Sequence, residues 1–248
     1  MGAAPLAGRR ALVTGGSRGI GAEIVRRLAA DGAAVAFTYA ASSQAADALV
    51  ADVTAAGGRA VAIAADAADR EQIGAAVEHA AAALGGLDVV VNNAGVAHIE
   101  PIDEFPAEQY DRLVEINIGG TYWTVRHAIK HLGEGARIIN IGSVNADRVP
   151  GPGVSVYAMT KGAVASFTRG LARDLGPRGI TVNNVQPGPI DTDLNPDEGD
   201  FAESLKQIVP LARYGQAGDV AAIVSFLAGP EGGFVTGANW NVDGGFTV

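Results

Sequence analysis

Short runs of apolar residues alternate with longer, Ala-rich segments of helical period along the whole chain. Buried parallel strands appear in a sequence as nearly continuous apolar runs, whereas a surface helix carries an apolar residue every three or four positions. The pattern predicts seven strands, at residues 11–13, 34–39, 60–64, 87–91, 137–141, 180–185 and 239–242. It predicts six helices, at residues 20–31, 43–56, 69–84, 107–132, 154–175 and 217–228.

Strands and helices that alternate in this way favour a parallel sheet covered by helices on both faces. We therefore expect an α/β fold, a doubly wound Rossmann sheet of seven parallel strands within a single domain spanning residues 1–248. Two segments, residues 144–153 and 189–216, contain several Pro and Gly residues and fit neither period. Because ligands of open parallel sheets bind beyond the carboxyl ends of the strands, we expect 189–216 to form a substrate loop or lid.

The composition narrows the class of protein. Apolar residues make up 48% of the 248 residues and charged residues 18%, which is typical of a globular protein with a sizeable core. The net charge of −9 argues against nucleic acid or an anionic membrane as a partner. No apolar run is long enough for a membrane span and no signal peptide is evident, so we expect a cytoplasmic protein. The absence of cysteine excludes thiolate chemistry, and the four histidines lack metal-ligand spacing, so no metal is expected.

A Gly-rich turn, Thr14–Gly21, joins the first predicted strand to the first predicted helix. Glycines let the backbone approach a pyrophosphate closely, and a helix amino terminus offers free amides and a positive dipole end. The spacing is Gly-x-x-x-Gly-x-Gly, which differs from the usual dinucleotide fingerprint, so a simple tight turn remains an alternative. The candidate cofactor-binding residues of the turn are Gly15, Ser17, Arg18, Gly19, Ile20 and Gly21.

The end of the second strand indicates which dinucleotide would bind. NAD enzymes usually place an acidic residue there to bind the ribose hydroxyls, and the stretch from Phe37 to Ser43, which includes Ala40, has none. Arg18 is suited to pair with a 2′-phosphate, and Ser42 or Ser43 to donate hydrogen bonds to it. Both observations favour NADP, although Arg18 as a solvated surface charge is the alternative.

The third and fourth strands end in further polar residues. Asp66 follows the third strand, within reach of an adenine amino group, and a turn or helix-cap aspartate is an equally good interpretation. The fourth strand runs into Asn92-Asn93-Ala94-Gly95. Its two amides are suited to satisfy loop backbone groups and to line the nucleotide crevice, or to form a purely structural turn.

Tyr157 and Lys161 stand four residues apart in the predicted helix 154–175, which places them on one face. A positive charge at about 4 Å would lower a tyrosine pKa by roughly three units at an effective dielectric of 20. That would bring the phenol into the range where acid/base catalysis is efficient. Such a pair is common on helices, so the other motifs of the chain have to show whether it is catalytic.

Those neighbours form a recognisable set. Thr14 to Gly21, Asn92 to Gly95, Asn117, Ser143, Tyr157 with Lys161, and Pro187-Gly188 occur in the order and approximate spacing of the short-chain dehydrogenases/reductases. The chain resembles that family over essentially its whole length, and is most similar to bacterial 3-oxoacyl-acyl-carrier-protein reductases. The stretches 141–148 and 186–193 also resemble a smaller branch, the cyclic-di-GMP-binding biofilm-dispersal proteins.

The resemblance implies a role for each catalytic candidate. Tyr157 would be the general acid, Lys161 would bind the nicotinamide ribose and lower the tyrosine pKa, and Ser143 would orient the carbonyl oxygen. Asn117 would hold a water that links Lys161 to solvent.

The resemblance also implies further cofactor contacts. Pro187, Gly188 and Ile190 would face the nicotinamide carboxamide, and Thr192 would lie near the phosphates. Asp66 with Ala67 would contact the adenine, while Asn93, Ala94 and Gly95 would line the adenosine side.

The function we expect from these residues is the reversible, NADP(H)-dependent reduction of a small ketone or a 3-oxoacyl group. The alternative is a regulatory protein on the same fold that binds cyclic-di-GMP; the complete Ser143, Tyr157, Lys161 and Asn117 set favours the enzyme. The resemblance implies a homo-oligomer, a tetramer or dimer. The acidic segment 196–200 argues weakly against an acyl-carrier substrate, because that carrier is itself acidic.

Overall fold

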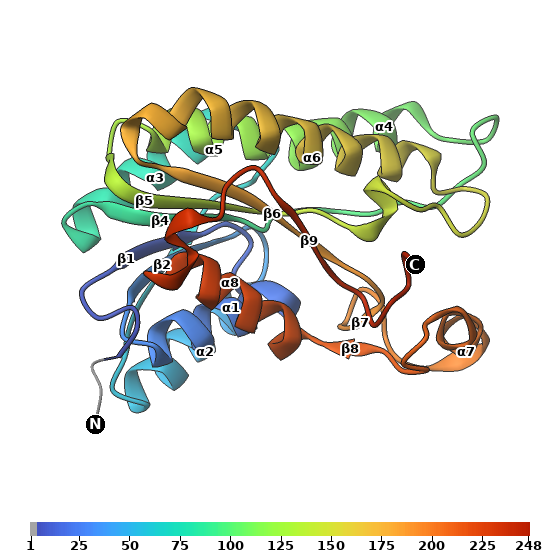
Figure 1. Ribbon diagram of the computed structural model, residues 1–248, viewed down its shortest axis with the longest axis horizontal. Helices are drawn as coiled ribbons and strands as arrows, with labels where there is room; N and C mark the ends of the chain where they lie inside the picture. Colours follow the sequence, from blue (N-terminus) through green and yellow to red (C-terminus); the bar gives the residue numbers. More distant parts are fainter. Residues whose placement is uncertain (1–3) are drawn as a thin grey trace.

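The structure, a computed structural model, describes residues 4–248, so the expected domain 1–248 begins with three residues outside the described part. Seven parallel strands form one sheet in the order β3-β2-β1-β4-β5-β6-β9 (Figure 1). The strands are β1 (Arg10–Val13), β2 (Ala34–Tyr39), β3 (Arg59–Ala64), β4 (Leu87–Asn92), β5 (Leu132–Ile141), β6 (Thr181–Pro187) and β9 (Asn239–Val242). The main helices are α1 (Gly19–Ala30), α2 (Ser43–Ala55), α3 (Arg70–Leu84), α4 (Ala107–Leu113), α5 (Thr121–Ala128), α6 (Ser155–Leu175) and α8 (Ala217–Ala228).

Helices cover both faces of the sheet, with α1, α2 and α8 on one side and α3 to α6 on the other (Figure 1). The strands supply both cores because successive side chains point to opposite faces. In β1, Ala11 and Val13 pack in the core beneath α1 and α8, whereas Leu12 packs in the core beneath α3 and α5. The predicted doubly wound α/β fold is therefore confirmed, with all seven predicted strands present.

The predicted helix 107–132 is wrong in its middle and at its end. A π-helix, Val114–Gly120, separates α4 from α5, and Leu132 already belongs to β5. Close packing accompanies the irregular turn: a Cβ on Gly120 would lie 2.9 Å from the backbone oxygen of Ala67. A hydrophobic period cannot reveal such an insertion, and π-turns often mark functional positions.

The segment 189–216 is more ordered than the sequence suggested. It contains α7 (Gly199–Ile208) and the short paired strands β7 (Ile190–Asp191) and β8 (Gly215–Gln216). In Figure 1, α7 lies beyond the carboxyl ends of the strands and outside both helix layers. A small separate core of Val144, Val209 and Phe246, with Leu205 packed against it, connects this segment to the loop after β5 and to the carboxyl terminus. Within residues 4–248, no helix combines the length and apolar character needed to cross a membrane.

Candidate functional site

The Gly-rich turn between β1 and α1 is closely packed. Gly15 has φ +63°, and its N–H donates to Thr38 Oγ1 at 3.0 Å. A Cβ on Gly21 would lie only 2.2 Å from the backbone oxygen of Gly15. The turn therefore closes directly onto the first residues of α1, where Arg18 occupies the exposed N-cap position. This geometry leaves the free amides of the helix amino terminus facing the carboxyl edge of the sheet.

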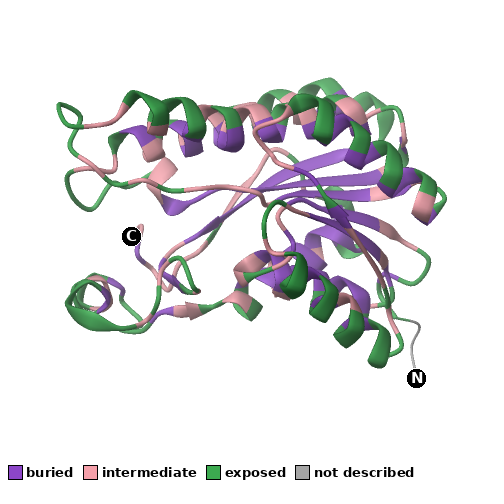
Figure 2. Ribbon diagram, turned by 180° about the vertical axis from the view of Figure 1, so that it is seen from behind, coloured by how far each residue is buried: buried purple, intermediate pink, exposed green. Residues whose placement is uncertain are grey.

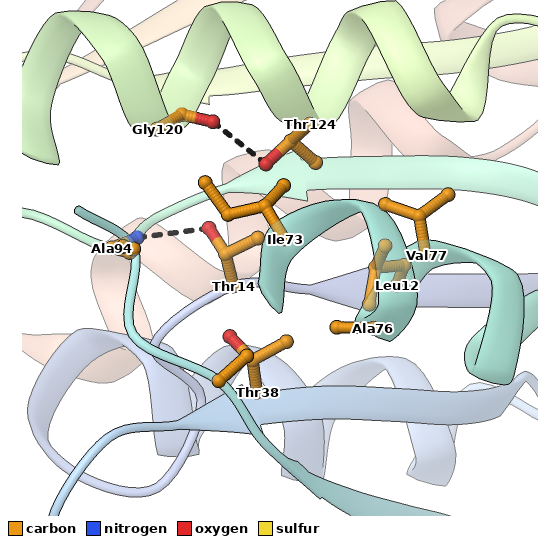
Figure 3. A pocket seen from close by; sticks show the side chains of 11 residues that line it. Leu12, Thr14, Thr38, Ile73, Ala76, Val77, Ala94, Gly120 and Thr124 are labelled. Atoms are coloured by element: carbon orange, nitrogen blue, oxygen red, sulfur yellow. Dashed lines mark hydrogen bonds between the residues drawn. The ribbon is translucent and has the colours of Figure 1, made fainter. Parts of the chain in front are cut away.

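Asn93 fastens the loop after β4 to this turn. Its Nδ2 donates to the backbone oxygens of Thr14 and Gly15 at 3.0 and 2.9 Å. Thr14 Oγ1 accepts the N–H of Asn93 at 3.0 Å. It also accepts the N–H of Ala94 at 3.0 Å (Figure 3). The prediction that an amide here satisfies loop backbone groups is confirmed, whereas the part played by Thr14 was missed.

A small cavity lies between the tips of β1 to β4 and the start of α3 (Figure 3). Its walls are mostly apolar, with threonine hydroxyls among them. The lining residues are Leu12, Thr14, Thr38, Ala65, Ala67, Ile73, Ala76, Val77, Ala94, Gly120 and Thr124. Asp66 stands beside Ala67, and its Oδ1 accepts the N–H of Ala68 at 3.0 Å, so it does serve as a turn aspartate. Cofactor candidates Ala67 and Ala94 thus share one cavity.

Tyr157 and Lys161 lie on one face of α6, as predicted. Lys161 Nζ is 5.7 Å from the centroid of the Tyr157 ring and donates to the backbone oxygen of Ile141 at 3.0 Å. Ile141 is the last residue of β5, and Ser143 follows it after Gly142. The end of β5 therefore brings Ser143 to the Tyr157 and Lys161 pair.

Burial governs the titration of this pair. It raises the pKa of Tyr157 above its ordinary value of 10, with the Ser143 hydroxyl acting in the opposite direction. It lowers the pKa of Lys161 from 10.5 to about 8. The expected net lowering of the tyrosine pKa by the lysine charge is therefore wrong for this structure. Removal from water disfavours the phenolate and the ammonium alike.

Asn117 sits in the π-helix and links two segments. Its Oδ1 accepts the N–H of Val96 at 2.9 Å, and its Nδ2 donates to Val96 O and to Thr160 Oγ1, both at 3.0 Å. A Cβ on Gly95 would lie 3.3 Å from Asn117 Oδ1 and 3.5 Å from Lys161 Nζ. Asn117 and Lys161 therefore flank Gly95, so the structure gathers all four catalytic candidates at the tips of β4 and β5.

Asn145 was not among the predicted site residues. Its backbone N–H donates to Ser143 Oγ at 3.2 Å, and Ser143 Oγ donates to Asn145 Oδ1 at 3.2 Å. The sequence did contain a signal, since an amide stands two residues after Ser143. It lies in the stretch 141–148, which was interpreted only as part of the family resemblance. In this conformation Asn145 holds the hydroxyl proton of Ser143.

The candidates after β6 reach back to the Gly-rich turn. The N–H of Gly188 donates to Val242 O at 3.0 Å, next to Pro187 at the end of β6. Ile190 is buried, and the methyl group of Thr192 would lie 3.5 Å from a Cβ on Gly19. Segments some 170 residues apart in the chain thus meet over the start of α1.

The remaining candidates lie at the end of β2. Ala40 is exposed, and Ser42 is the partly exposed N-cap residue of α2. Among residues 4–248, no three His, Cys, Asp or Glu side chains are grouped so that they could hold a metal ion.

Known proteins match the chain over almost its whole length. A family model described as enoyl-(acyl carrier protein) reductase matches residues 15–247. The cyclic-di-GMP-binding biofilm dispersal mediator protein of Escherichia coli K12 is 47% identical, over 96% of this chain and 97% of that protein. A 3-oxoacyl-[acyl-carrier-protein] reductase of Synechocystis is 39% identical, over 96% of each. A short chain dehydrogenase from Burkholderia cenocepacia, crystallised with NADP, is 49% identical with a TM-score of 0.97, over 98% of this chain and 100% of that chain.

Proposed function

This chain belongs to the short-chain dehydrogenase/reductase family, and we propose that it reduces a ketone or a 3-oxoacyl group with NADPH, reversibly. The family resemblance predicted from the sequence is confirmed by relatives that include 3-oxoacyl-acyl-carrier-protein reductases. One observation carries the proposal: Ser143, Tyr157, Lys161 and Asn117 converge at the strand tips, beside a Gly-rich turn. A protein that only binds nucleotides has no physical need for that set.

The residues on the nucleotide side fit NADP(H). The turn at Gly15 and Gly21 leaves no room for side chains, which suits a backbone that binds a pyrophosphate at the start of α1. The small cavity that Ala67 and Ala94 share has room for about one water molecule, so the adenine ring would lie outside it, against these two residues at the strand tips. Arg18, exposed at the N-cap of α1, would pair with the 2′-phosphate, with Ser42 as a second donor.

The other candidates would hold the rest of the cofactor. Residues after β6, Pro187, Gly188 and Ile190, would contact the nicotinamide, and Thr192 the phosphates. Solved relatives that contain NADP or NADPH support the choice of cofactor.

Tyr157 would supply the proton for the reduction. When bound, the reduced nicotinamide provides a hydride for the carbonyl carbon. Tyr157 gives its hydroxyl proton to the carbonyl oxygen, and its raised pKa keeps it protonated at neutral pH. The half-buried phenolate that results is stabilised by the Lys161 ammonium. Since the pKa of Lys161 is about 8, Lys161 can then return a proton to Tyr157.

Ser143 would be the second donor to the carbonyl oxygen. Its hydroxyl has to turn from Asn145 Oδ1 to the substrate, while the N–H of Asn145 still binds Ser143 Oγ. Two hydroxyl donors placed where negative charge develops stabilise the transition state. Asn117 would position a water beside Lys161 and so connect the amine to solvent.

Segment 189–216 would act as a lid, because its small core with Val144 lies next to Ser143. We infer one domain and a homo-oligomer. Exposed aromatic side chains on α5 and just before β9, Tyr122 and Phe234, support contacts between copies.

The second candidate function is cyclic-di-GMP binding on the same fold. The likeness to the Escherichia coli dispersal mediator favours it. The messenger would have to share the nucleotide side of the strand tips, so it and NADPH would compete.

The test follows NADPH absorbance across a panel of ketones, beside calorimetric titration with cyclic-di-GMP. We expect turnover, and we expect Tyr157→Phe to lower kcat by about a thousandfold because the proton donor is lost. NADPH affinity should change by less than about threefold, since the phenol adds little to ground-state binding.

Tyr110→Phe, an exposed tyrosine on α4, is the matched control and should keep full turnover. The absence of turnover with every ketone, together with tight cyclic-di-GMP binding, would establish the regulatory function instead.

A further inference from the structure

Exposed apolar side chains concentrate on three segments around the catalytic candidates. We name these segments the rim: residues 96–106 after β4, 142–154 after β5, and 189–216 after β6. The rim makes up about a fifth of the described chain, yet it holds seven of the twelve large hydrophobic side chains exposed there. The seven are Ile99, Ile102, Val149, Leu194, Phe201, Ile208 and Leu211. Figure 2 shows α7 exposed over most of its length.

The three rim segments are joined next to Ser143. The N–H of Glu100 donates to the backbone oxygen of Gly153 at 3.0 Å, which links the first segment to the second. Val144 and Val209 share the small separate core, which links the second to the third. These two contacts connect the three rim segments to one another, and Val144 places the second of them directly after Ser143.

The rim also accounts for most of the net negative charge of the protein. Ten acidic and three basic residues give it a net charge of −7, out of −9 for the whole chain. The basic groups are engaged within the protein: Lys206 contacts Asp197 and Glu203, and the Arg148 guanidinium lies over the Phe246 ring. The acids are Glu100, Asp103, Glu104, Asp147, Asp191, Asp193, Asp197, Glu198, Asp200 and Glu203; the bases are Arg148, Lys206 and Arg213.

We propose that the substrate is a ketone that bears an apolar aromatic or aliphatic group and no negative charge. The apolar side chains of the rim gain by covering such a group, since burial removes apolar surface from water. The carboxylates repel a substrate carboxylate or phosphate, and repulsion between like charges discriminates against the wrong ligand. This inference rests on the proposed reductase function. It disfavours a 3-oxoacyl group delivered on an acidic carrier.

Four small ketones separate charge from apolarity. Benzoylacetamide and benzoylacetate differ in charge at nearly equal size, and acetoacetamide and acetoacetate repeat the pair without the phenyl group. We expect kcat/KM for each amide to exceed that for its acid by about tenfold or more at low ionic strength. The ratio should shrink in half-molar salt because salt screens exposed charges. Benzoylacetamide should exceed acetoacetamide by about tenfold or more, as the rim covers the phenyl group.

Binding is measured separately from turnover. The Tyr157→Phe protein saturated with NADPH gives calorimetric dissociation constants for the same four ketones, and these should follow the same order. If the reductase proposal fails, no ketone is turned over, yet the binding order still tests the rim. If only the substrate class is wrong, turnover persists with the acids equal or preferred.

Two variants test which rim residues produce the amide preference and the phenyl preference. Asp193→Asn with Glu198→Gln, two exposed rim carboxylates, should lower the amide preference about threefold. Phe201→Ala on α7 should lower the phenyl preference by a similar factor. The control is Glu134→Gln with Asp174→Asn, which removes the same charge at the amino-terminal edge of the sheet and should leave both preferences unchanged.

Three results would overturn the proposal. The first is a preference for the carboxylates at low salt, and the second is an equal effect of the control pair. The third is a rim variant that changes the oligomeric state, measured by light scattering, while both preferences stay the same. That result would make the apolar rim a contact between copies.

Discussion

The nucleotide side of the strand tips and the rim differ in how tightly the chain determines them. On the nucleotide side, Thr14 and Asn93 satisfy the backbone of the turn, and a Cβ on Gly21 would enter the backbone of Gly15. The rim contributes Val144 and Val209 to a small separate core with Phe246, and seven of its large apolar side chains are exposed. Binding residues often lie on loops placed by a rigid scaffold. Here backbone groups would bind the cofactor, whereas side chains that can be substituted without disturbing the fold would contact the substrate.

This difference predicts where the protein tolerates change. The nucleotide side is part of the main core, because Val13 and Phe37 lie at the ends of β1 and β2 next to the turn and pack beneath α1. Within the rim, Ile190 is the buried residue that packs in that core, so we expect rim mutations to destabilise the sheet less than mutations on the nucleotide side. Mutations on the nucleotide side should therefore change stability and NADPH affinity, whereas mutations in the rim should change the KM for the ketone.

The largest effect should follow Gly21→Ala. The new methyl group would lie 2.2 Å from Gly15 O and 2.5 Å from Asn93 Nδ2, so the turn would have to move. We expect the free energy of unfolding to fall by about 3 kcal/mol, and NADPH affinity to fall more than about a hundredfold. Thermal unfolding and calorimetry measure the two quantities.

Gly170→Ala is the matched control, because a Cβ there meets nothing within 4 Å in the exposed part of α6. It should raise stability by up to about 1 kcal/mol, since alanine is the better helix former. Equal affinities for NADPH in the wild-type and Gly21→Ala proteins would show that the turn is not the nucleotide site.

The same difference explains what could be predicted from the sequence. The nucleotide side is built from local signals, a strand that ends in glycines and a helix that starts there, so the turn around Gly15 and Gly21 was found directly. The conformation of the rim depends on packing between residues that are far apart in the chain. Helix α7 was missed because Pro196 and Gly199 interrupt its start, and its contact with Val144 joins residues far apart in the chain.

The catalytic pair shows a second limit of sequence reasoning. The four-residue spacing of Tyr157 and Lys161 correctly placed both on one face of α6. The direction of the tyrosine pKa shift was wrong because it depends on burial, which is a property of the folded surroundings. Likewise, the hydrogen bonds of Asn117 needed a π-turn that no hydrophobic period announces.

A smaller effect on the nucleotide side should follow Arg18→Ala. The exposed guanidinium at the start of α1 would pair with the 2′-phosphate, and charge-assisted hydrogen bonds contribute roughly 1.5–3 kcal/mol. We expect the dissociation constant for NADPH to rise about tenfold to a hundredfold, and that for NADH to change less than about twofold.

Arg169→Ala removes the same charge from an exposed position on α6, in the other helix layer, and should change neither constant. Equal losses for NADPH and NADH in Arg18→Ala would contradict the assignment of the 2′-phosphate to this residue. The nucleotide side would then lack the cofactor preference that we attribute to it.

The smallest effect should follow Val209→Ala on the rim, and Val185→Ala in β6 is its counterpart in the main core. Both valines are buried, at 3% and 0% exposure. Val185→Ala leaves a cavity in a packed sheet and should lower the free energy of unfolding by about 2 kcal/mol. Val209→Ala loosens α7 from Val144, and we expect less than about 1 kcal/mol of global loss, because Val209 packs in a small cluster separate from the main core. Its KM for the ketone should instead rise about threefold, while NADPH affinity stays constant. Denaturant titration and steady-state kinetics separate the two outcomes. Equal losses of stability with an unchanged KM would mean that the rim is held as firmly as the sheet.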